Sequence, residues 1–201
     1  MLIGLGLGPG NPEFLTLRAV RLLKEADAVF VPGPLAYELV RPYREPVMLS
    51  FPMTDDESRI MESMRQNAGM IAPAARNGIA VFGILGDPNF FSTFSRLCAV
   101  MDEEYPDIEC CTEPGISAIT AFAAAANLSL ASGFIVSDGG MPDIRILLKV
   151  RRPKECAQAL RKEGYREFVL VERMYFPDMR VYRNGELPEQ SDYLSVMYAR
   201  R

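Results

Sequence analysis

The segment from Ile79 to Leu85 constrains the fold most strongly, because it is a continuous apolar run. Strands with one solvated face alternate apolar and polar residues, whereas strands covered on both faces are apolar throughout. The run is followed at once by Gly86-Asp87-Pro88, which predicts a strand that ends at a turn. The pattern therefore favours an α/β fold built on a parallel-rich sheet with helices on both faces.

The rest of the first half alternates strands and helices, as a parallel sheet with crossover helices requires. Strands are predicted at Met1 to Leu7, at Ala28 to Val31, near Val47 and at Ile108 to Cys111. Helices are predicted after a Thr16 N-cap, at Asp55 to Asn77, at Thr93 to Glu104 and at Ile116 to Ala126. The last of these is so rich in alanine that we expect another element to pack closely against it. The Asn77-Gly78 pair is typical of a helix C-cap.

The second half has a different pattern of elements. Strands are predicted at Ile146 to Val150 and Phe168 to Val171, a helix at Pro153 to Glu163, and a closing antiparallel pair at Asp178 to Asn184 and Tyr193 to Ala199. We therefore predict two domains: an N-terminal α/β domain over residues 1–112 and a C-terminal α+β domain with a mixed sheet over residues 113–201.

Composition excludes several function classes. The 201 residues include no histidine, so Ser-His-Asp and Cys-His nucleophile systems and H-E-x-x-H zinc sites are excluded. The net charge of -4 argues against nucleic-acid binding, because phosphate backbones are held by clustered Lys and Arg. Cys98, Cys110, Cys111 and Cys156 contain no C-x-x-C pair. We predict that they are buried free thiols and that the protein binds no metal.

The N-terminal sequence, MLIGLGLGPG, has no basic segment of the kind that opens a secretory signal. Its apolar run is also far too short to cross a bilayer. We expect a cytoplasmic protein with no membrane partner.

Three turns that contain glycine or proline are the candidates for ligand binding. They are residues 4–10 (GLGLGPG), 86–94 (GDPNFFSTF) and 113–118 (EPGISA). The first matches neither the G-x-G-x-x-G fingerprint nor a P-loop. The second follows the most apolar strand, and ligands of open α/β sheets bind at the carboxyl ends of strands. Each turn also has a structural interpretation, which is tight packing for the first and helix capping for the other two.

In this order and spacing, the three turns resemble those of the tetrapyrrole methylase family, over essentially the whole chain. The resemblance implies a two-domain fold with a cofactor cleft between the domains, S-adenosylmethionine as methyl donor, S-adenosylhomocysteine as product, and a homodimer. The stretches F-P-M-T-D-D at 51–56, G-D-P-x-F-x-S-T-x-S at 86–95 and S-D-Y-L-S-V at 191–196 are similar to the carbon-20 branch. That branch methylates precorrin-2 or cobalt-factor II in cobalamin biosynthesis.

The resemblance also implies site residues. The implied cofactor contacts are Pro9, Leu85, Gly86, Asp87, Phe90, Ser117 and Ala118, with Leu148 and Met174 from the second domain. A carboxylate such as Asp87 is suited to the ammonium group of the cofactor. The reaction requires mainly in-line placement of a methyl group beside an electron-rich carbon. The catalytic residue is therefore unassigned, and Tyr175 is a weak candidate to orient the substrate or relay a proton.

A tetrapyrrole substrate carries many carboxylates, so a protein of net negative charge needs a local basic cluster to bind it. The candidates are Arg96, Lys149, Arg151 and Arg152, with Arg145 and Arg173 as further cations. Each of them has the alternative interpretation of an ordinary solvated residue.

Two alternative functions remain open. One is a related methylase with another acceptor, either a different corrin carbon or the modified histidine on the diphthine route, whose branch shares the Ser92-Thr93 sequence. The other is a small-molecule binding protein or catalytically silent subunit on the same scaffold. The second gains weight from the segment between Leu130 and Arg145, which is short for the carbon-20 branch.

Overall fold

The computed structural model describes residues 1–137, 139–140 and 142–201. The chain forms two compact units, Met1–Phe134 and Ile135–Arg201. The division lies later than the boundary after residue 112 that the sequence suggested. The start of the segment that follows residue 112 is tied to the first unit: β5 (Cys110–Glu113) belongs to its sheet, and the Gly115 amide donates to Asp87 Oδ2 at 3.1 Å.

The first unit contains a five-stranded sheet in the order β3-β2-β4-β1-β5. Its strands are β1 (Leu2–Gly6), β2 (Ala28–Val31), β3 (Val47–Met48), β4 (Ala80–Ile84) and β5 (Cys110–Glu113). Every described pairing is parallel. Strand β4, from the apolar run, lies between β2 and β1 with all of its residues buried, which confirms the prediction.

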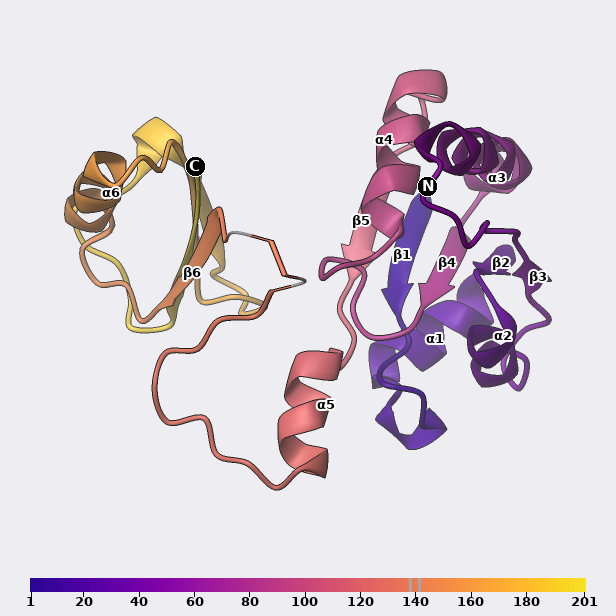
Figure 1. Cartoon of the computed structure of the whole chain (residues 1–201), viewed down its shortest axis with the longest axis horizontal. Coiled ribbons are helices and arrows are strands. Elements are labelled where there is room, and N and C mark those ends of the chain that lie inside the picture. Colours follow the sequence, from indigo (N-terminus) through magenta and orange to yellow (C-terminus); the bar gives the residue numbers. More distant parts are fainter. Residues whose placement is uncertain (138, 141) are drawn as a thin grey trace. The chain divides into compact units, whose positions relative to one another are not determined.

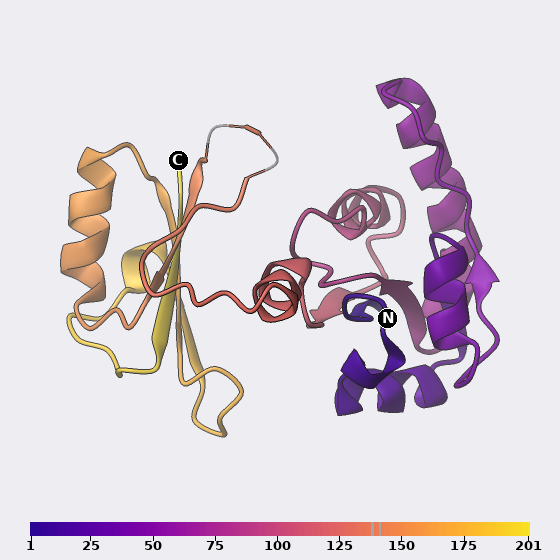
Figure 2. The same cartoon turned by 60° about the horizontal axis from the view of Figure 1, so that its bottom comes forward.

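Helices cover both faces of this sheet (Figures 1 and 2). Helices α1 (Leu17–Glu25) and α2 (Pro34–Val40) cover one face, and α3 (Glu57–Asn77) and α4 (Phe94–Glu104) cover the other. Helix α1 begins at the predicted N-cap, Thr16, whose hydroxyl accepts from the Ala19 amide at 2.9 Å. A 3₁₀ turn, Pro12–Phe14, precedes it.

Helix α5 (Ala118–Ala125) differs from the close packing expected of it. None of its eight residues, all of which the structure describes, is buried. The Phe122 side chain is 62% exposed. Burial within the first unit therefore does not account for the alanine content of this helix.

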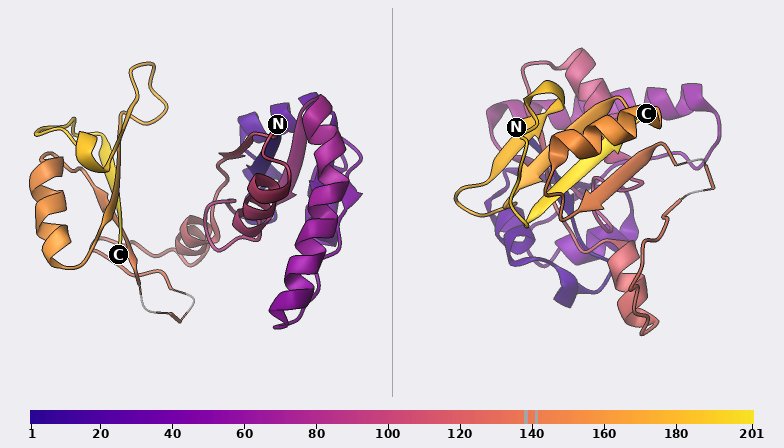
Figure 3. Two further views of the ribbon diagram at one scale, coloured as in Figure 1. Left: turned by 90° about the horizontal axis from the view of Figure 1, so that it is seen from above. Right: turned by 90° about the vertical axis from the view of Figure 1, so that its left-hand side faces the viewer.

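The second unit contains a four-stranded sheet in the order β6-β9-β7-β8, and α6 (Pro153–Lys162) lies along one of its faces (Figure 3). The strands are β6 (Ile144–Leu148), β7 (Glu167–Glu172), β8 (Arg180–Arg183) and β9 (Ser195–Arg200), and a 3₁₀ turn follows β8 at Asn184–Glu186. Phe168, Leu170 and Met197 are fully buried in its core.

The pairing in this sheet differs from the prediction in two respects. Every described pairing is antiparallel, so the sheet is not mixed. Strands β8 and β9 do not pair with each other; both pair with β7. Strand β7 carries the buried Phe168 and Leu170. It lies between β9 and β8, so both of its hydrogen-bonding edges are paired.

Among the described residues, no helix combines the length and apolarity that a bilayer crossing needs.

The four cysteines are free but half-buried, not buried as predicted. A hydrogen bond between the thiols of Cys98 and Cys110 raises the pKa of Cys98 and lowers that of Cys110, whereas burial raises the pKa of Cys111 and Cys156.

Gly78, which follows α3, is required by a close approach and not by the predicted C-cap geometry. Its backbone is extended, with φ 178° and ψ -142°. A Cβ at this position would lie 2.7 Å from Asp27 Cγ. Asp27 Oδ2 in turn accepts the Ile79 amide at 2.8 Å, just before β4 begins.

We expect Gly78→Ala to lower the free energy of unfolding by about 1–3 kcal/mol, because Asp27 must move and leave the Ile79 amide without its acceptor. Urea denaturation measures the change. Gly69→Ala is the matched control: it lies inside α3, a Cβ there would be 3.4 Å from Tyr105 Oη, and alanine favours the helix. Equal stability of the Gly78→Ala protein and the native protein would contradict this role.

Candidate active site

The three turns singled out in the sequence meet at the carboxyl ends of β1, β4 and β5. The Gly86 amide donates to the Gly8 carbonyl at 2.8 Å, and the Gly8 amide donates to the Gly86 carbonyl at 3.3 Å. A Cβ on Gly115 would lie 2.7 Å from the carbonyl carbon of Gly6. The glycines therefore let three backbones approach closely, which supports the tight-packing interpretation of the first turn. We call these three turns the glycine junction.

Asp87 links two of the turns. Its carboxylate is 7% exposed; Oδ1 accepts from the Asn89 amide at 2.9 Å and Asn89 Nδ2 at 3.2 Å, and Oδ2 accepts from the Gly115 amide at 3.1 Å. These donors satisfy the buried charge within the chain. Asp87 does not cap the next helix, because α4 begins after an N-cap at Thr93. It accepts a local turn amide instead, together with a long-range bond that no sequence pattern indicated. A cofactor ammonium group would share oxygens that are already engaged.

The surface beside the glycine junction combines apolar side chains with accessible backbone. Leu85 and Phe90 are 39% and 44% exposed, and Pro9 is also exposed. Gly86 has φ +75°, and the described atom nearest to a Cβ built there is the Ala118 amide nitrogen, at 3.9 Å. Space therefore remains next to the backbone at this position.

Ser117 occupies the N-cap position of α5, but its side chain makes no capping hydrogen bond with any described residue. The capping interpretation of the third turn is therefore not supported for this hydroxyl. Exposed apolar side chains, open backbone and a nearby hydroxyl fit a ligand with a flat base, a ribose and a polar tail. The first unit thus brings together the predicted cofactor contacts Pro9, Leu85, Gly86, Asp87, Phe90, Ser117 and Ala118.

The predicted second-unit residues lie at one end of the second sheet. Leu148 ends β6 and is 68% exposed; Met174 and Tyr175 follow β7 and are 41% and 75% exposed. Because β6 and β7 both run antiparallel to β9, their carboxyl ends lie on the same side. The Tyr175 backbone has φ 64°, and its amide donates to Met179 Sδ at 3.4 Å. Its role in catalysis stays a prediction.

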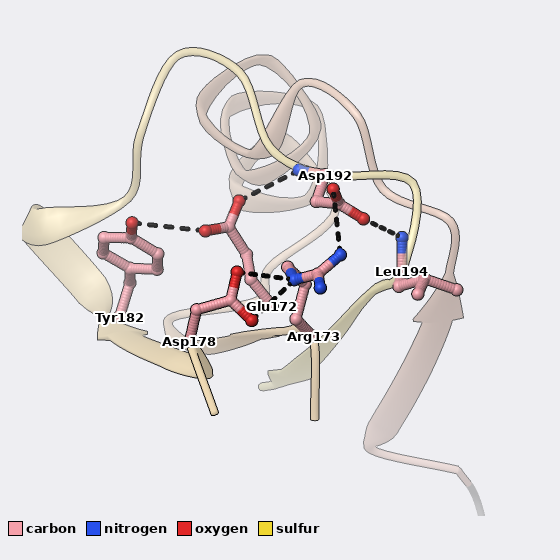
Figure 4. A network of polar contacts seen from close by, with 6 residues as sticks. All are labelled: Glu172, Arg173, Asp178, Tyr182, Asp192 and Leu194. Atoms are coloured by element: carbon pink, nitrogen blue, oxygen red, sulfur yellow. Dashed lines mark hydrogen bonds and ion pairs between the residues drawn. The ribbon is translucent and has the colours of Figure 1, made fainter. Parts of the chain in front are cut away.

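A buried carboxylate fixes this end of the sheet (Figure 4). Glu172 is 7% exposed and accepts from Tyr182 Oη at 3.3 Å and the Asp192 amide at 3.0 Å. The next residue, Arg173, donates from Nε to Asp178 at 2.8 Å, which holds the pKa of Asp178 below its usual range. Glu172 was not among the residues predicted from the sequence to form the site. Its alternation with Phe168 and Leu170, which places all three on the buried face, is the signal that could have found it.

The structure separates the candidate substrate-binding cations into two groups. Arg96 pairs with Glu57 at 3.1 Å, Arg145 with Glu163 at 2.8 Å, Arg152 with Glu155 at 3.3 Å and Arg173 with Asp178 at 2.8 Å. Lys149 and Arg151 instead lie over the Tyr193 ring. No group of three or more Cys, Asp or Glu side chains in the described part of the chain is placed to hold a metal ion.

Two of the stretches that resemble the carbon-20 branch line one groove in the first unit. The groove has a volume of about 360 Å³ and is lined by Phe51, Pro52, Ile60, Met64, Phe91, Ser92, Thr93 and Arg96. Phe91 is 68% exposed and has φ 50°, a conformation uncommon outside glycine. Residues 51–52 and 91–93, far apart in the sequence, therefore form one surface.

Residues 1–186 match the sequence pattern of the Tetrapyrrole (Corrin/Porphyrin) Methylases. A probable cobalt-precorrin-2 C(20)-methyltransferase from Methanocaldococcus jannaschii is 29% identical over 98% of this chain and 95% of its own length. A diphthine synthase from Pyrobaculum calidifontis is 30% identical over 86% of this chain, which spans 65% of that protein. A precorrin-2 C(20)-methyltransferase from Sinorhizobium sp is 31% identical over 66% of this chain and 60% of its own length.

Solved structures show the same fold. The methyltransferase CobJ aligns over 100% of this chain and 93% of its own, with a TM-score of 0.52 and 21% identity. The cobalt precorrin-4 methyltransferase CbiF aligns over 98% of this chain and 93% of its own, with a TM-score of 0.53 and 18% identity. Together with the sequence match over residues 1–186, these findings place the chain in the tetrapyrrole methylase family, as an S-adenosylmethionine-dependent C-methyltransferase.

Proposed function

We propose that this enzyme methylates carbon 20 of precorrin-2 or of cobalt-factor II in cobalamin biosynthesis. The observation that carries the proposal is the extent of the similarity to the probable C(20)-methyltransferase of M. jannaschii, which covers 98% of this chain and 95% of that protein. The diphthine synthase, by contrast, is matched over 65% of its length. The groove formed by residues 51–52 and 91–93 adds support, because two stretches typical of the carbon-20 branch line it.

The residues of the chain would position the cofactor and the acceptor and would exclude water from the site. Bound S-adenosylmethionine supplies an activated methyl group on a sulfonium sulfur. Pro9, Leu85 and Phe90 would cover its adenosine, with polar contacts from Ser117 and the backbone at Ala118. Holding the acceptor in line can supply several of the roughly 7–11 kcal/mol available from orientation. A chain without histidine can perform such a reaction.

The second unit would also contribute to the site. Leu148 and Met174 would be the second-unit contacts to the cofactor, and Tyr175 would orient the substrate or relay a proton. We also propose a cytoplasmic homodimer that holds no metal of its own. Light scattering and elemental analysis of the purified protein test the dimer and the metal content.

The proposed reaction is tested by incubating the native protein with precorrin-2, with and without cobalt, and with S-adenosylmethionine labelled with carbon-13 in the methyl group. We expect the tetrapyrrole to gain the mass of one labelled methyl group, and nuclear magnetic resonance to place the label on carbon 20. A reaction with unlabelled cofactor is the control for the assignment.

Other outcomes identify the alternatives. A label on a different corrin carbon, or transfer only to the modified histidine of elongation factor 2, would assign the chain to a related branch of the family. The 30% identity to a diphthine synthase makes the second acceptor worth including. Cofactor binding without transfer to either acceptor would overturn the proposed reaction.

A further inference from the structure

Two cationic side chains of the second unit share one aromatic ring. Lys149 Nζ lies 5.2 Å and Arg151 Cζ lies 5.4 Å from the centroid of Tyr193. The electron-rich face of an aromatic ring attracts each cation. None of the ion pairs found among the described residues includes Lys149 or Arg151, whereas Arg96, Arg145, Arg152 and Arg173 all have carboxylate partners.

Hydrogen bonds hold the backbone at Asp192 and Leu194, the neighbours of Tyr193 in the chain (Figure 4). The buried Glu172 accepts the Asp192 amide at 3.0 Å, and Asp192 Oδ1 accepts the Leu194 amide at 2.7 Å. The Arg173 amide donates to the Leu194 carbonyl at 2.8 Å. These bonds tie the segment that carries Tyr193 to the end of β7.

The same segment is also tied to the cations. The Ser191 amide donates to the Arg151 carbonyl at 3.0 Å, and the Ser191 hydroxyl donates to the Val150 carbonyl. Asp192, the acidic residue of this segment, is already engaged by the Leu194 amide and lies 4.0 Å from Arg173 Nη1. Lys149 and Arg151 are both exposed to solvent, and both contact the ring of a segment that hydrogen bonds hold in place. A side chain that is already held in position loses less conformational entropy when it binds a ligand.

We propose that Lys149 and Arg151, supported by Tyr193, form a carboxylate-binding clamp for the periphery of the tetrapyrrole acceptor. This inference rests on the proposed function. The guanidinium can hold one carboxylate through two parallel hydrogen bonds, and the ammonium acts as a compact point charge for a second. Tyr193 is a positioning residue, because it acts through the two side chains that it supports.

The test measures binding without methyl transfer. Uroporphyrin, a fluorescent tetrapyrrole polycarboxylate, is titrated into the native protein at low and high salt. We expect binding that weakens with salt, because exposed charges are screened. Replacing both cations, in Lys149→Gln/Arg151→Gln, should weaken the low-salt affinity about 10- to 100-fold and flatten the salt dependence. Affinity for S-adenosylmethionine should change less than about threefold, since neither cation is among the proposed cofactor contacts.

The matched control is Arg161→Gln/Lys162→Gln. It also removes two positive charges from the second unit, one from an arginine and one from a lysine. Arg161 likewise lies over an aromatic ring, with Cζ 4.9 Å from the Phe168 centroid. We expect this control to bind uroporphyrin nearly as well as the native protein. An equal loss in both double variants would attribute binding to net charge and overturn the clamp.

Tyr193 variants test the support. Tyr193→Phe keeps the ring and should bind uroporphyrin normally, whereas Tyr193→Leu removes the ring and should weaken binding several-fold. If Tyr193→Leu does not fold, the pair of charge variants decides the question. Salt-independent binding, no binding to the native protein, or native affinity in Lys149→Gln/Arg151→Gln would each overturn the inference. Loss of uroporphyrin binding in that variant, from a native protein that methylates neither acceptor, would uphold the clamp and reject the proposed reaction.

Discussion

Gly115→Ala is expected to reduce methyl transfer at least about 100-fold, because it forces apart the backbones of the glycine junction. A Cβ on Gly115 would overlap the Gly86 carbonyl oxygen and lie 2.7 Å from both the carbonyl carbon and the Cα of Gly6. These neighbours are backbone atoms, so relief requires movement of β1 or of the Gly86 turn. Overpacking of this kind costs roughly 1–3 kcal/mol, so the melting temperature should fall as well.

The control for this variant is Gly133→Ala, also in the first unit. A Cβ there would have no described atom within 4 Å, so stability and activity should stay near native values. Calorimetric affinity for S-adenosylmethionine and the rate of methyl transfer are measured on both proteins. Native affinity and rate in Gly115→Ala would show that the close approach at the junction does not position the cofactor site.

Most strands and helices of the first unit could be predicted from local signals. Strand β4 was identified from an apolar run, and the start of α1 from a threonine at its N-cap. The position of β9 between β6 and β7 could not be predicted in the same way, because it brings together segments far apart in the sequence. Side-chain alternation indicates which face of a strand is buried, but not which strand lies beside it.

The candidate site was likewise predictable in part. Glycine and proline turns after strands identified all three loops of the glycine junction, since parallel strands end at the same edge of a sheet. The partners of Asp87 and Glu172 required the structure, because the Gly115 and Asp192 amides come from distant segments. The sequence likewise does not indicate which of the six candidate cations pair with carboxylates. Only their partners distinguish Lys149 and Arg151 from the four arginines that pair with carboxylates.

Asp87→Asn is expected to weaken S-adenosylmethionine binding about 10- to 100-fold and to reduce turnover further. The asparagine carbonyl can still accept the Asn89 amide, but its NH₂ group would face the Gly115 amide, which is also a donor. A buried N–H without an acceptor costs about 1–3 kcal/mol. Asp87→Ala removes both acceptors and should be more severe. Asn89→Ala, which removes only the side-chain bond at 3.2 Å, is the milder control.

A second ligand distinguishes positioning by Asp87 from direct contact with the cofactor. 5′-Methylthioadenosine has the adenosine and sulfur of the cofactor but no ammonium group. Because the oxygens of Asp87 accept from Asn89 and Gly115, we expect Asp87→Asn to weaken binding of both ligands. If only S-adenosylmethionine bound more weakly, Asp87 would act on the ammonium group directly. Unchanged affinity for both ligands with an unchanged rate would remove Asp87 from the site, so calorimetry with the two ligands separates all three roles.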